Sequence, residues 1–217
     1  MKFKYLVVVL SLFSLVILYL ITGLSQPTVV PFSELPANEG KQVVVQGIVA
    51  GYQTTTTGST LVTLRNDDVN NTTTITVYVE GQLTLEYGDI VQVTGTVQQY
   101  NNQWELAVEN PQSITVLEHW SNRSFPLWQL AQNPERYVDT NVNVTGVIGT
   151  FTSTTFELQD FTEGSTVPVT YKRSSNASFS KGDVVAVQAR FLYDETTLSY
   201  LLKVADAAKD IQILKQG

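Results

Sequence analysis

Residues able to carry out catalysis are few in this chain. His119 is the only histidine among 217 residues, and there is no cysteine. One histidine cannot build a multi-histidine metal site, and the lack of thiols excludes thiolate zinc sites, iron–sulfur clusters and cysteine catalysis. His119 lies in the connecting segment Glu118–Arg123, where side chains are seldom held rigidly enough to activate a nucleophile. We expect a solvated linker histidine.

Carboxylates give no stronger indication of catalysis. Glu105 with Glu109, and Glu157 with Asp160, could be offered as paired acids for glycoside hydrolysis. They fall in short predicted strands, and such pairs arise by chance in a chain with 20 acidic residues. There is also no glycine-rich phosphate loop and no nucleotide-binding fingerprint. The sequence therefore predicts no enzymatic activity, no cofactor and no metal.

An oxygen-rich loop is the single candidate for binding a hard cation. It contains Asp67, Asp68, Asn70 and Asn71, and calcium prefers such oxygen ligands. It has neither the spacing of an EF-hand nor a closing glutamate, so an ordinary polar loop between two strands is favoured.

Aromatic and cationic side chains are better candidates for binding. The candidate ligand-binding residues are Tyr52, Arg65, Tyr78, Tyr100, Trp104, Tyr171, Lys172 and Arg173. Stacking on aromatic rings, combined with cations, is how many proteins hold single-stranded nucleic acid. The competing interpretation is that the tyrosines and tryptophans only close barrel ends and brace hairpins.

These residues are positioned by strands, which the period-two alternation of apolar residues predicts. The predicted strands are Gln42–Tyr52, Thr60–Arg65, Thr73–Val79, Ile90–Tyr100 and Gln103–Val108, then Asn141–Thr152, Thr155–Asp160, Thr166–Tyr171, Asp183–Leu192 and Leu198–Val204. Short helical segments are expected before each set, at Phe32–Ala37 and Phe125–Asn133.

The same alternation predicts which side chains face outward. The residues taken as inward are Val62, Leu64, Ile75, Val77 and Val79. Arg65, Thr74, Thr76 and Tyr78 then lie on the outer face of the second and third strands.

The region after the N-terminal segment is an internal duplication with a period of roughly 95–99 residues. Gly88-Asp-Ile-Val-Gln-Val-Thr-Gly-Thr-Val is matched by Gly182-Asp-Val-Val-Ala-Val-Gln-Ala-Arg-Phe. Val43-Val-Val-Gln-Gly-Ile-Val is matched by Val142-Asn-Val-Thr-Gly-Val-Ile. Further landmarks follow in the same order, which predicts two tandem domains.

Each copy resembles an OB-fold. The resemblance rests on five strands, a short element after the third strand, and a glycine, Gly47 or Gly146, within a long first strand. The pattern V-x-V-x-G-x-V … G-D-x-V-x-V-x-G-x-V is similar to OB domains of the anticodon-binding and single-strand-binding superfamily. It implies an all-β chain with two tandem five-stranded OB-type barrels, residues 26–118 and 127–217, joined by a linker at 119–126. Two unrelated small β-domains, or one sandwich of nine to ten strands, remain the alternatives.

The N-terminal residues 1–25 are expected to form a transmembrane anchor. Tyr5–Leu24 is uncharged and long enough to span a bilayer. Lys2 and Lys4 precede it, which predicts a single-pass protein of the cell membrane with its C-terminal region extracytoplasmic. Cleavage of a signal peptide before Gln26 is the alternative. The glycosylation sequons expected to be used are Asn122, Asn71 and Asn176, whereas Asn143 lies in a predicted strand.

The net charge of −7 is unevenly distributed. Residues 27–118 hold ten acidic and two basic residues, while residues 119–217 hold ten acidic and nine basic ones. An acidic first domain repels phosphate backbones. The preferred hypothesis is a membrane-anchored, non-catalytic binding or assembly module for a protein or glycan of the cell envelope. The alternative is an exported single-stranded nucleic-acid-binding protein, for which Lys172, Arg173 and Lys181 form a basic cluster.

A further alternative comes from a second resemblance. The haem chaperone of cytochrome c maturation is also an N-terminally anchored OB barrel with a haem-linked histidine after its last strand. This chain resembles it in Pro31-Phe-Ser-Glu-Leu before the barrel and in His119 after Val116-Leu-Glu. It departs from the family in its second barrel and in Arg123, which stands where the family has a tyrosine.

Overall fold

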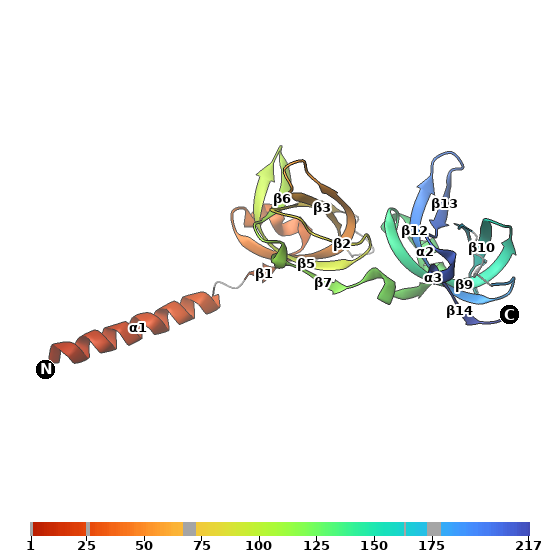
Figure 1. Cartoon of the computed structure of the whole chain (residues 1–217). Helices are drawn as coiled ribbons and strands as arrows, with labels where there is room; N and C mark the ends of the chain where they lie inside the picture. Colours follow the sequence, from red (N-terminus) through yellow and green to blue (C-terminus); the bar gives the residue numbers. More distant parts are fainter. Residues whose placement is uncertain (1, 25–26, 67–72, 163, 173–178) are drawn as a thin grey trace.

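Two closed β-barrels in tandem, preceded by a helix, make up the chain (Figure 1). The computed structural model describes residues 2–24, 27–66, 73–162, 164–172 and 179–217. The helix α1 (Lys2–Leu24) projects away from the first barrel in Figure 1. The prediction of an all-β chain with two five-stranded barrels is confirmed.

The first barrel closes through five strands. Its elements are β1 (Thr28–Val29), η1 (Phe32–Asn38), β2 (Gln42–Thr54), β3 (Thr60–Arg65), β4 (Thr74–Val79), β5 (Ile90–Tyr100), β6 (Gln103–Val108), η2 (Pro111–Ser113) and β7 (Ile114–Glu118). The sheet order is β1-β2-β3-β4-β6-β5-β7, and pairing of β2 with β5 closes the barrel. β4 and β6 run parallel, with Thr76 paired to Glu105 and Val79 paired to Val108.

The second barrel repeats this topology. Its elements are η3 (Trp120–Asn122), β8 (Ser124–Pro126), α2 (Leu127–Gln132), η4 (Pro134–Arg136), β9 (Thr140–Phe151), β10 (Thr155–Gln159), β11 (Thr166–Thr170), β12 (Val184–Asp194), β13 (Ser199–Lys203), α3 (Ala207–Asp210) and β14 (Ile211–Lys215). Its order is β14-β12-β13-β11-β10-β9-β8, closed by β12 with β9.

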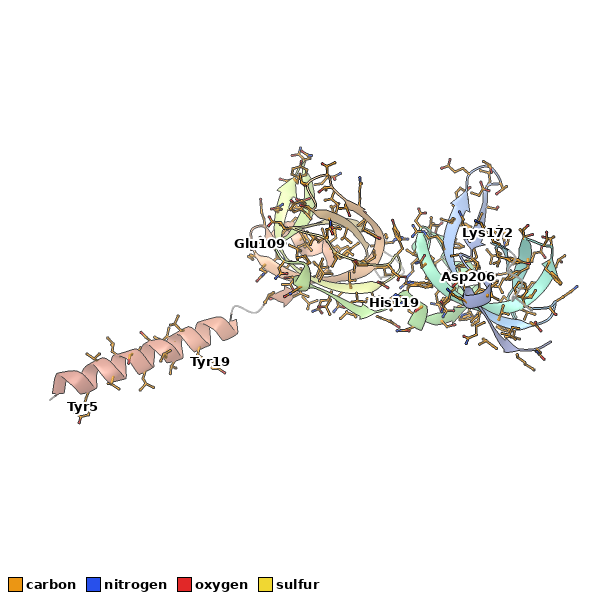
Figure 2. The ribbon with its side chains drawn as sticks, viewed as in Figure 1. Tyr5, Tyr19, Glu109, His119, Lys172 and Asp206 are labelled. Carbon is orange, nitrogen blue, oxygen red and sulfur yellow. The ribbon has the colours of Figure 1, made fainter. Side chains whose placement is uncertain are left out.

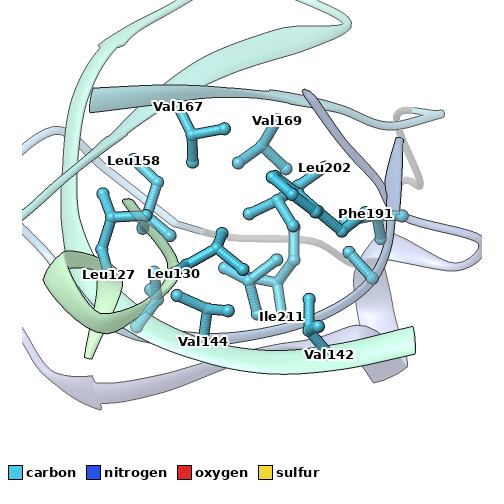
Figure 3. Packing of buried hydrophobic residues seen from close by; sticks show 14 of the residues in the cluster. Leu127, Leu130, Val142, Val144, Leu158, Val167, Val169, Phe191, Leu202 and Ile211 are labelled. Carbon is cyan, nitrogen blue, oxygen red and sulfur yellow. The ribbon is translucent and has the colours of Figure 1, made fainter. Parts of the chain in front are cut away.

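A hydrophobic core fills each barrel, and the short helix before the first long strand contributes side chains to it. The five residues predicted to face inward, Val62, Leu64, Ile75, Val77 and Val79, are buried. Phe32 and Leu35 of η1 enter the first core, and Leu127 and Leu130 of α2 enter the second (Figure 3). The segment between the third and fourth strands ends in a turn in both copies, and in the first barrel it also contributes Leu85 to the core.

A buried aspartate ties each barrel together at the repeated Gly-Asp motif. Asp89 is 2 % exposed, and its two oxygens accept hydrogen bonds from the backbone N–H groups of Glu86 and Trp120, both at 3.1 Å. Asp183 does the same for Ser180, at 2.7 Å, and Gly217, at 3.0 Å. Each carboxylate therefore connects the chain that follows the fifth barrel strand to the turn before the fourth one, which is β5 in the first barrel and β12 in the second.

The two barrels contact each other directly at a junction, through hydrogen bonds and a cation–π interaction. Asn141 N–H donates to the Tyr87 carbonyl at 3.2 Å. The Arg65 guanidinium donates to the carbonyls of Glu135, at 2.7 Å, and Val138, at 2.9 Å. Arg190 lies over the Tyr87 ring, 3.6 Å from its centroid. These contacts give the barrels a defined relative orientation.

The N-terminal expectation is not supported. In the part of the chain that the structure describes, no helix combines the length and the apolarity needed to cross a bilayer. The transmembrane anchor expected over Tyr5–Leu24 therefore has no support from the structure.

Two equivalent glycines give a matched test of the junction. Gly88 and Gly182 have nearly the same φ, +94° and +93°, but a Cβ on Gly88 would lie 2.4 Å from the Asn141 carbonyl oxygen. The nearest atom to a Cβ on Gly182 is Gly217 Cα at 3.7 Å. Gly182→Ala is expected to cost about 1–2 kcal/mol of unfolding free energy, because alanine is strained at positive φ. Gly88→Ala should cost more and also separate the barrels.

Urea denaturation measures the free energies, and the distance between spin labels at Gln112 and Glu195, one on each barrel, measures the separation. The absence of native cysteine makes the labelling specific. Equal losses and an unchanged label distance would contradict a tight contact at Gly88.

Candidate ligand-binding site

The first barrel carries an open cavity of about 580 Å³ between the β2–β3 loop and the β5–β6 hairpin. The residues that line it are Thr55, Leu61, Thr76, Tyr78, Gln98, Tyr100, Asn101, Gln103, Trp104 and Glu105. This is the region in which OB barrels bind ligands. The cavity brings together three predicted site residues, Tyr78, Tyr100 and Trp104.

Strand register explains why these side chains converge. Thr76 of β4 and Gln98 of β5 both pair with Glu105 of β6. Because Val77, Val97 and Leu106 are buried in the core, alternation turns these three residues to the outer face. Leu61 pairs with Tyr78 on the same side. The cavity floor is therefore built on strands.

The polar groups of the cavity are amides, hydroxyls and one carboxylate. Glu105 is 7 % exposed, and Gln98 Nε2 donates a hydrogen bond to its Oε1 at 2.7 Å. The Tyr78 hydroxyl shares a hydrogen bond of 2.9 Å with Ser59 Oγ, which fixes the phenol ring. Tyr100 is 63 % exposed, whereas Trp104 also packs against the barrel core. No lining residue is basic.

Two predicted site residues lie at the junction instead. Tyr52 lies beside Tyr87, with the two rings tilted by 37° and their centroids 5.4 Å apart. Arg65 was expected on the outer binding face but is 8 % exposed and bonded to the second barrel. Its burial lowers the pKa of the guanidinium, Asp139 acts in the opposite direction, and Arg136 lowers it further. The end of β3 faces the second barrel, which alternation within one strand could not indicate.

The tyrosine of the cluster predicted on the second barrel is buried. Tyr171 is 7 % exposed, its hydroxyl donates to the Thr152 carbonyl at 3.0 Å, and its ring packs against Phe156 and Phe179. Lys172 is exposed (Figure 2), and Arg173 lies outside the described residues. The tyrosine expected beside these cations is therefore part of the core.

His119 is held in place between the barrels rather than freely solvated (Figure 2). Its Nδ1 lies 2.7 Å from Ser121 Oγ. Its Nε2 lies 3.6 Å from Glu86 Oε2 and 3.7 Å from Asp89 Oδ1. Both ring nitrogens thus face protein groups, which does not favour a role as an axial haem ligand.

The other sequence candidates are scattered. Asn122 is exposed, whereas Asn143 is buried and donates to the Ser121 carbonyl. Asn71, Asn176 and the oxygen-rich loop at 67–71 lie outside the described residues. Within residues that the structure describes, no group of three or more acidic, histidine or cysteine side chains could hold a metal ion.

Sequence reasoning missed the amide side of the cavity. Gln98, Asn101 and Gln103 line it together with Leu61 and Thr55. The sequence Asn101-Asn102, which is typical of a two-residue hairpin turn, was the available signal, because a hairpin brings the ends of both its strands to the same loop.

Comparisons with known proteins bear on the fold alone. No protein-family model matches the chain, and no curated protein matches it in sequence. Among solved structures, the second OB-fold domain of replication protein A from Methanococcus maripaludis is 20 % identical, with a TM-score of 0.32 over 42 % of this chain and 95 % of that one.

Two other solved structures give comparable scores. An aspartyl-tRNA synthetase from Entamoeba histolytica is 18 % identical, with a TM-score of 0.33 over 49 % of this chain and 26 % of the synthetase. A murine DNA-binding protein bound with ds DNA is 13 % identical, with a TM-score of 0.32 over 81 % and 96 %. The match spans about a quarter of the synthetase. At such scores function must follow from this chain's own residues.

The assignment of one tyrosine to the site and another to the core can be tested by stability. Tyr100→Ser should change the free energy of unfolding by no more than about 0.5 kcal/mol, because the side chain is mostly exposed. Tyr171→Ala should cost about 3–5 kcal/mol, because it leaves a cavity among Phe156 and Phe179. Urea denaturation followed by circular dichroism measures both, and similar losses would contradict the distinction.

Proposed function

We propose that the chain is a non-catalytic binding protein whose first barrel holds part of a partner molecule in the cavity around Tyr78, Tyr100 and Glu105. One observation carries the proposal. A cavity of about 580 Å³ combines aromatic rings, amides and a buried carboxylate on strands that fix their positions. Such a concave, partly apolar site with a few polar groups is the usual form of a ligand site.

The charges favour a protein or glycan partner. The lining has no basic residue, and its one charged side chain, Glu105, would repel an anionic ligand. Residues 27–118 carry ten acidic and two basic residues, and one of these two, Arg65, is buried at the junction. A neutral or positively charged group fits this environment.

Single-stranded nucleic acid is the second candidate. Tyr100 and Trp104 flank the β5–β6 hairpin, where OB barrels place aromatic rings against bases. The neighbours described as a replication protein A domain and a DNA-binding protein belong with this reading. The exposed Lys172 and Lys181 of the second barrel could contact phosphates. These lysines belong to the second barrel, whereas the aromatic cavity belongs to the first, which makes this the weaker candidate.

Attachment to a membrane through α1, with the barrels outside the cytoplasm, is part of the proposal. The large apolar side chains of α1 that the structure describes, which include Tyr5, Phe13 and Tyr19, are exposed (Figure 2). A helix that is apolar on all sides is unstable in water. Lys2 and Lys4 before the apolar run support an inside N-terminus.

Alkaline carbonate extraction tests this attachment. The full chain is expected to stay in the membrane pellet, and a chain beginning at Gln26 is expected in the supernatant. The physical reason is that carbonate removes proteins bound by charge but not those held by buried apolar surface. Release of the full chain by carbonate would contradict attachment through α1.

Photocrosslinking in native membranes tests the binding proposal. A photoreactive phenylalanine in place of Tyr100 is expected to form a discrete adduct, because this position lines the cavity and is exposed. The matched control replaces Gln112, which is exposed on η2 and does not line the cavity. Gel mobility and mass spectrometry identify the adduct.

Adducts of equal yield at both positions, or none at Tyr100, would argue against a site at the cavity.

Fluorescence anisotropy with labelled single-stranded DNA and RNA separates the protein or glycan candidate from the nucleic-acid candidate. Tight binding that weakens steeply with salt, and that Lys172→Ala reduces, would establish the nucleic-acid reading in place of the first.

A further inference from the structure

We infer that the cavity of the first barrel recognises an organic cation, an ammonium or guanidinium group such as a basic side chain of a partner protein. This inference rests on the proposed function, since it names the chemical class of the ligand for the same cavity. It follows from three properties of the lining: a buried acceptor, two placed phenol rings and the absence of any positive charge.

The buried acceptor is Glu105. An ionised carboxylate is an acceptor only, with about four lone-pair sites. Gln98 Nε2 supplies one donor at 2.7 Å. Burial of a carboxylate is costly unless donors or a counter-charge compensate it. A cation entering the cavity supplies both the charge and further N–H donors.

The phenol rings are Tyr78 and Tyr100. Tyr78 is held by its hydrogen bond to Ser59 and lies on the same outer face as Glu105. Tyr100 is on β5, two residues from Gln98, at the open side of the cavity. The negative face of an aromatic ring attracts ammonium and guanidinium groups. Rings beside a carboxylate form the kind of cage that recognises such cations.

The charges around the cavity also favour a cationic ligand. No basic residue lines the cavity, and the first barrel's Arg65 is turned away into the junction. A cleft lined by one sign of charge concentrates ligands of the opposite sign. A neutral sugar could stack on the same rings and donate hydroxyl hydrogen bonds to Glu105, but it would bring no positive charge to the carboxylate. The carboxylate therefore favours a cation over a glycan.

The test uses the full chain in detergent micelles with 5-fluorotryptophan at its three tryptophans. Trp104 lines the cavity, whereas Trp120 and Trp128 do not and serve as internal references. Choline is the cationic probe, and 3,3-dimethylbutan-1-ol, in which carbon replaces the quaternary nitrogen, is its neutral isostere. Choline is expected to shift the Trp104 fluorine signal saturably, with a Kd of about 1 mM, while the isostere leaves it unchanged.

A matched pair of variants assigns the effect to one carboxylate. Glu105→Gln should weaken choline binding roughly ten-fold or more, because the ionic attraction between the carboxylate and the quaternary ammonium is lost. Glu109→Gln makes the same change in net charge outside the cavity, since Glu109 is exposed and does not line it. It should change affinity by less than about two-fold. A lysine-containing tripeptide and its norleucine analogue separate a partner's side chain from a free small cation as the natural source.

Equal binding of choline and its isostere would overturn the inference, as would equal weakening by both glutamate variants. A Trp104 signal that neither choline nor the lysine peptide shifts would overturn it too. If crosslinking at Tyr100 still gave a discrete adduct, the proposed binding site would stand without the cation. If crosslinking at Tyr100 also gave no adduct, both the proposed binding site and the inferred cation ligand would be wrong.

Discussion

A buried aspartate, present once in each barrel, is the constraint on which the arrangement of this chain depends. Asp89 and Asp183 are almost inaccessible to solvent, and each is surrounded by backbone N–H donors from two segments far apart in sequence. A carboxylate can be buried only where such donors are in place. In the first barrel this requirement fixes where the chain leaves β7, and so where the linker starts.

The junction between the barrels follows from that fixed exit. Trp120, bound to Asp89 through its backbone, begins η3, and the Asn143 side chain bonds to the carbonyl of Ser121. Gly88 then approaches Asn141 so closely that no side chain fits between them. Two arginines complete the contact. Arg65 donates hydrogen bonds to two backbone carbonyls of the second barrel, and Arg190 lies over the Tyr87 ring. A linker with no obvious structure in sequence becomes part of a packed interface.

The electrostatic character of the cavity is a consequence of the junction. The first barrel has two basic residues, Lys41 and Arg65, and the junction takes up Arg65. The cavity on β4, β5 and β6 therefore lies on an acidic barrel with no guanidinium nearby in its lining. Glu105 remains at its floor as an acceptor beside Tyr78 and Tyr100, which sets the kind of ligand that the site can hold.

The sequence alone determined the strands, the duplication and the barrels, because alternation with period two and repeated Gly-Asp motifs are local patterns. It also predicted Tyr78, Tyr100 and Trp104 as site residues, and the structure places these three side chains at one cavity. It could not place Arg65 or Tyr171, whose alternation is the same whether a side chain meets solvent, another barrel or a core. Only the tertiary structure decided those positions, since each depends on what packs against the strand from elsewhere in the chain. The same holds for Glu105, whose burial among Thr76 and Gln98 arises from strand pairing.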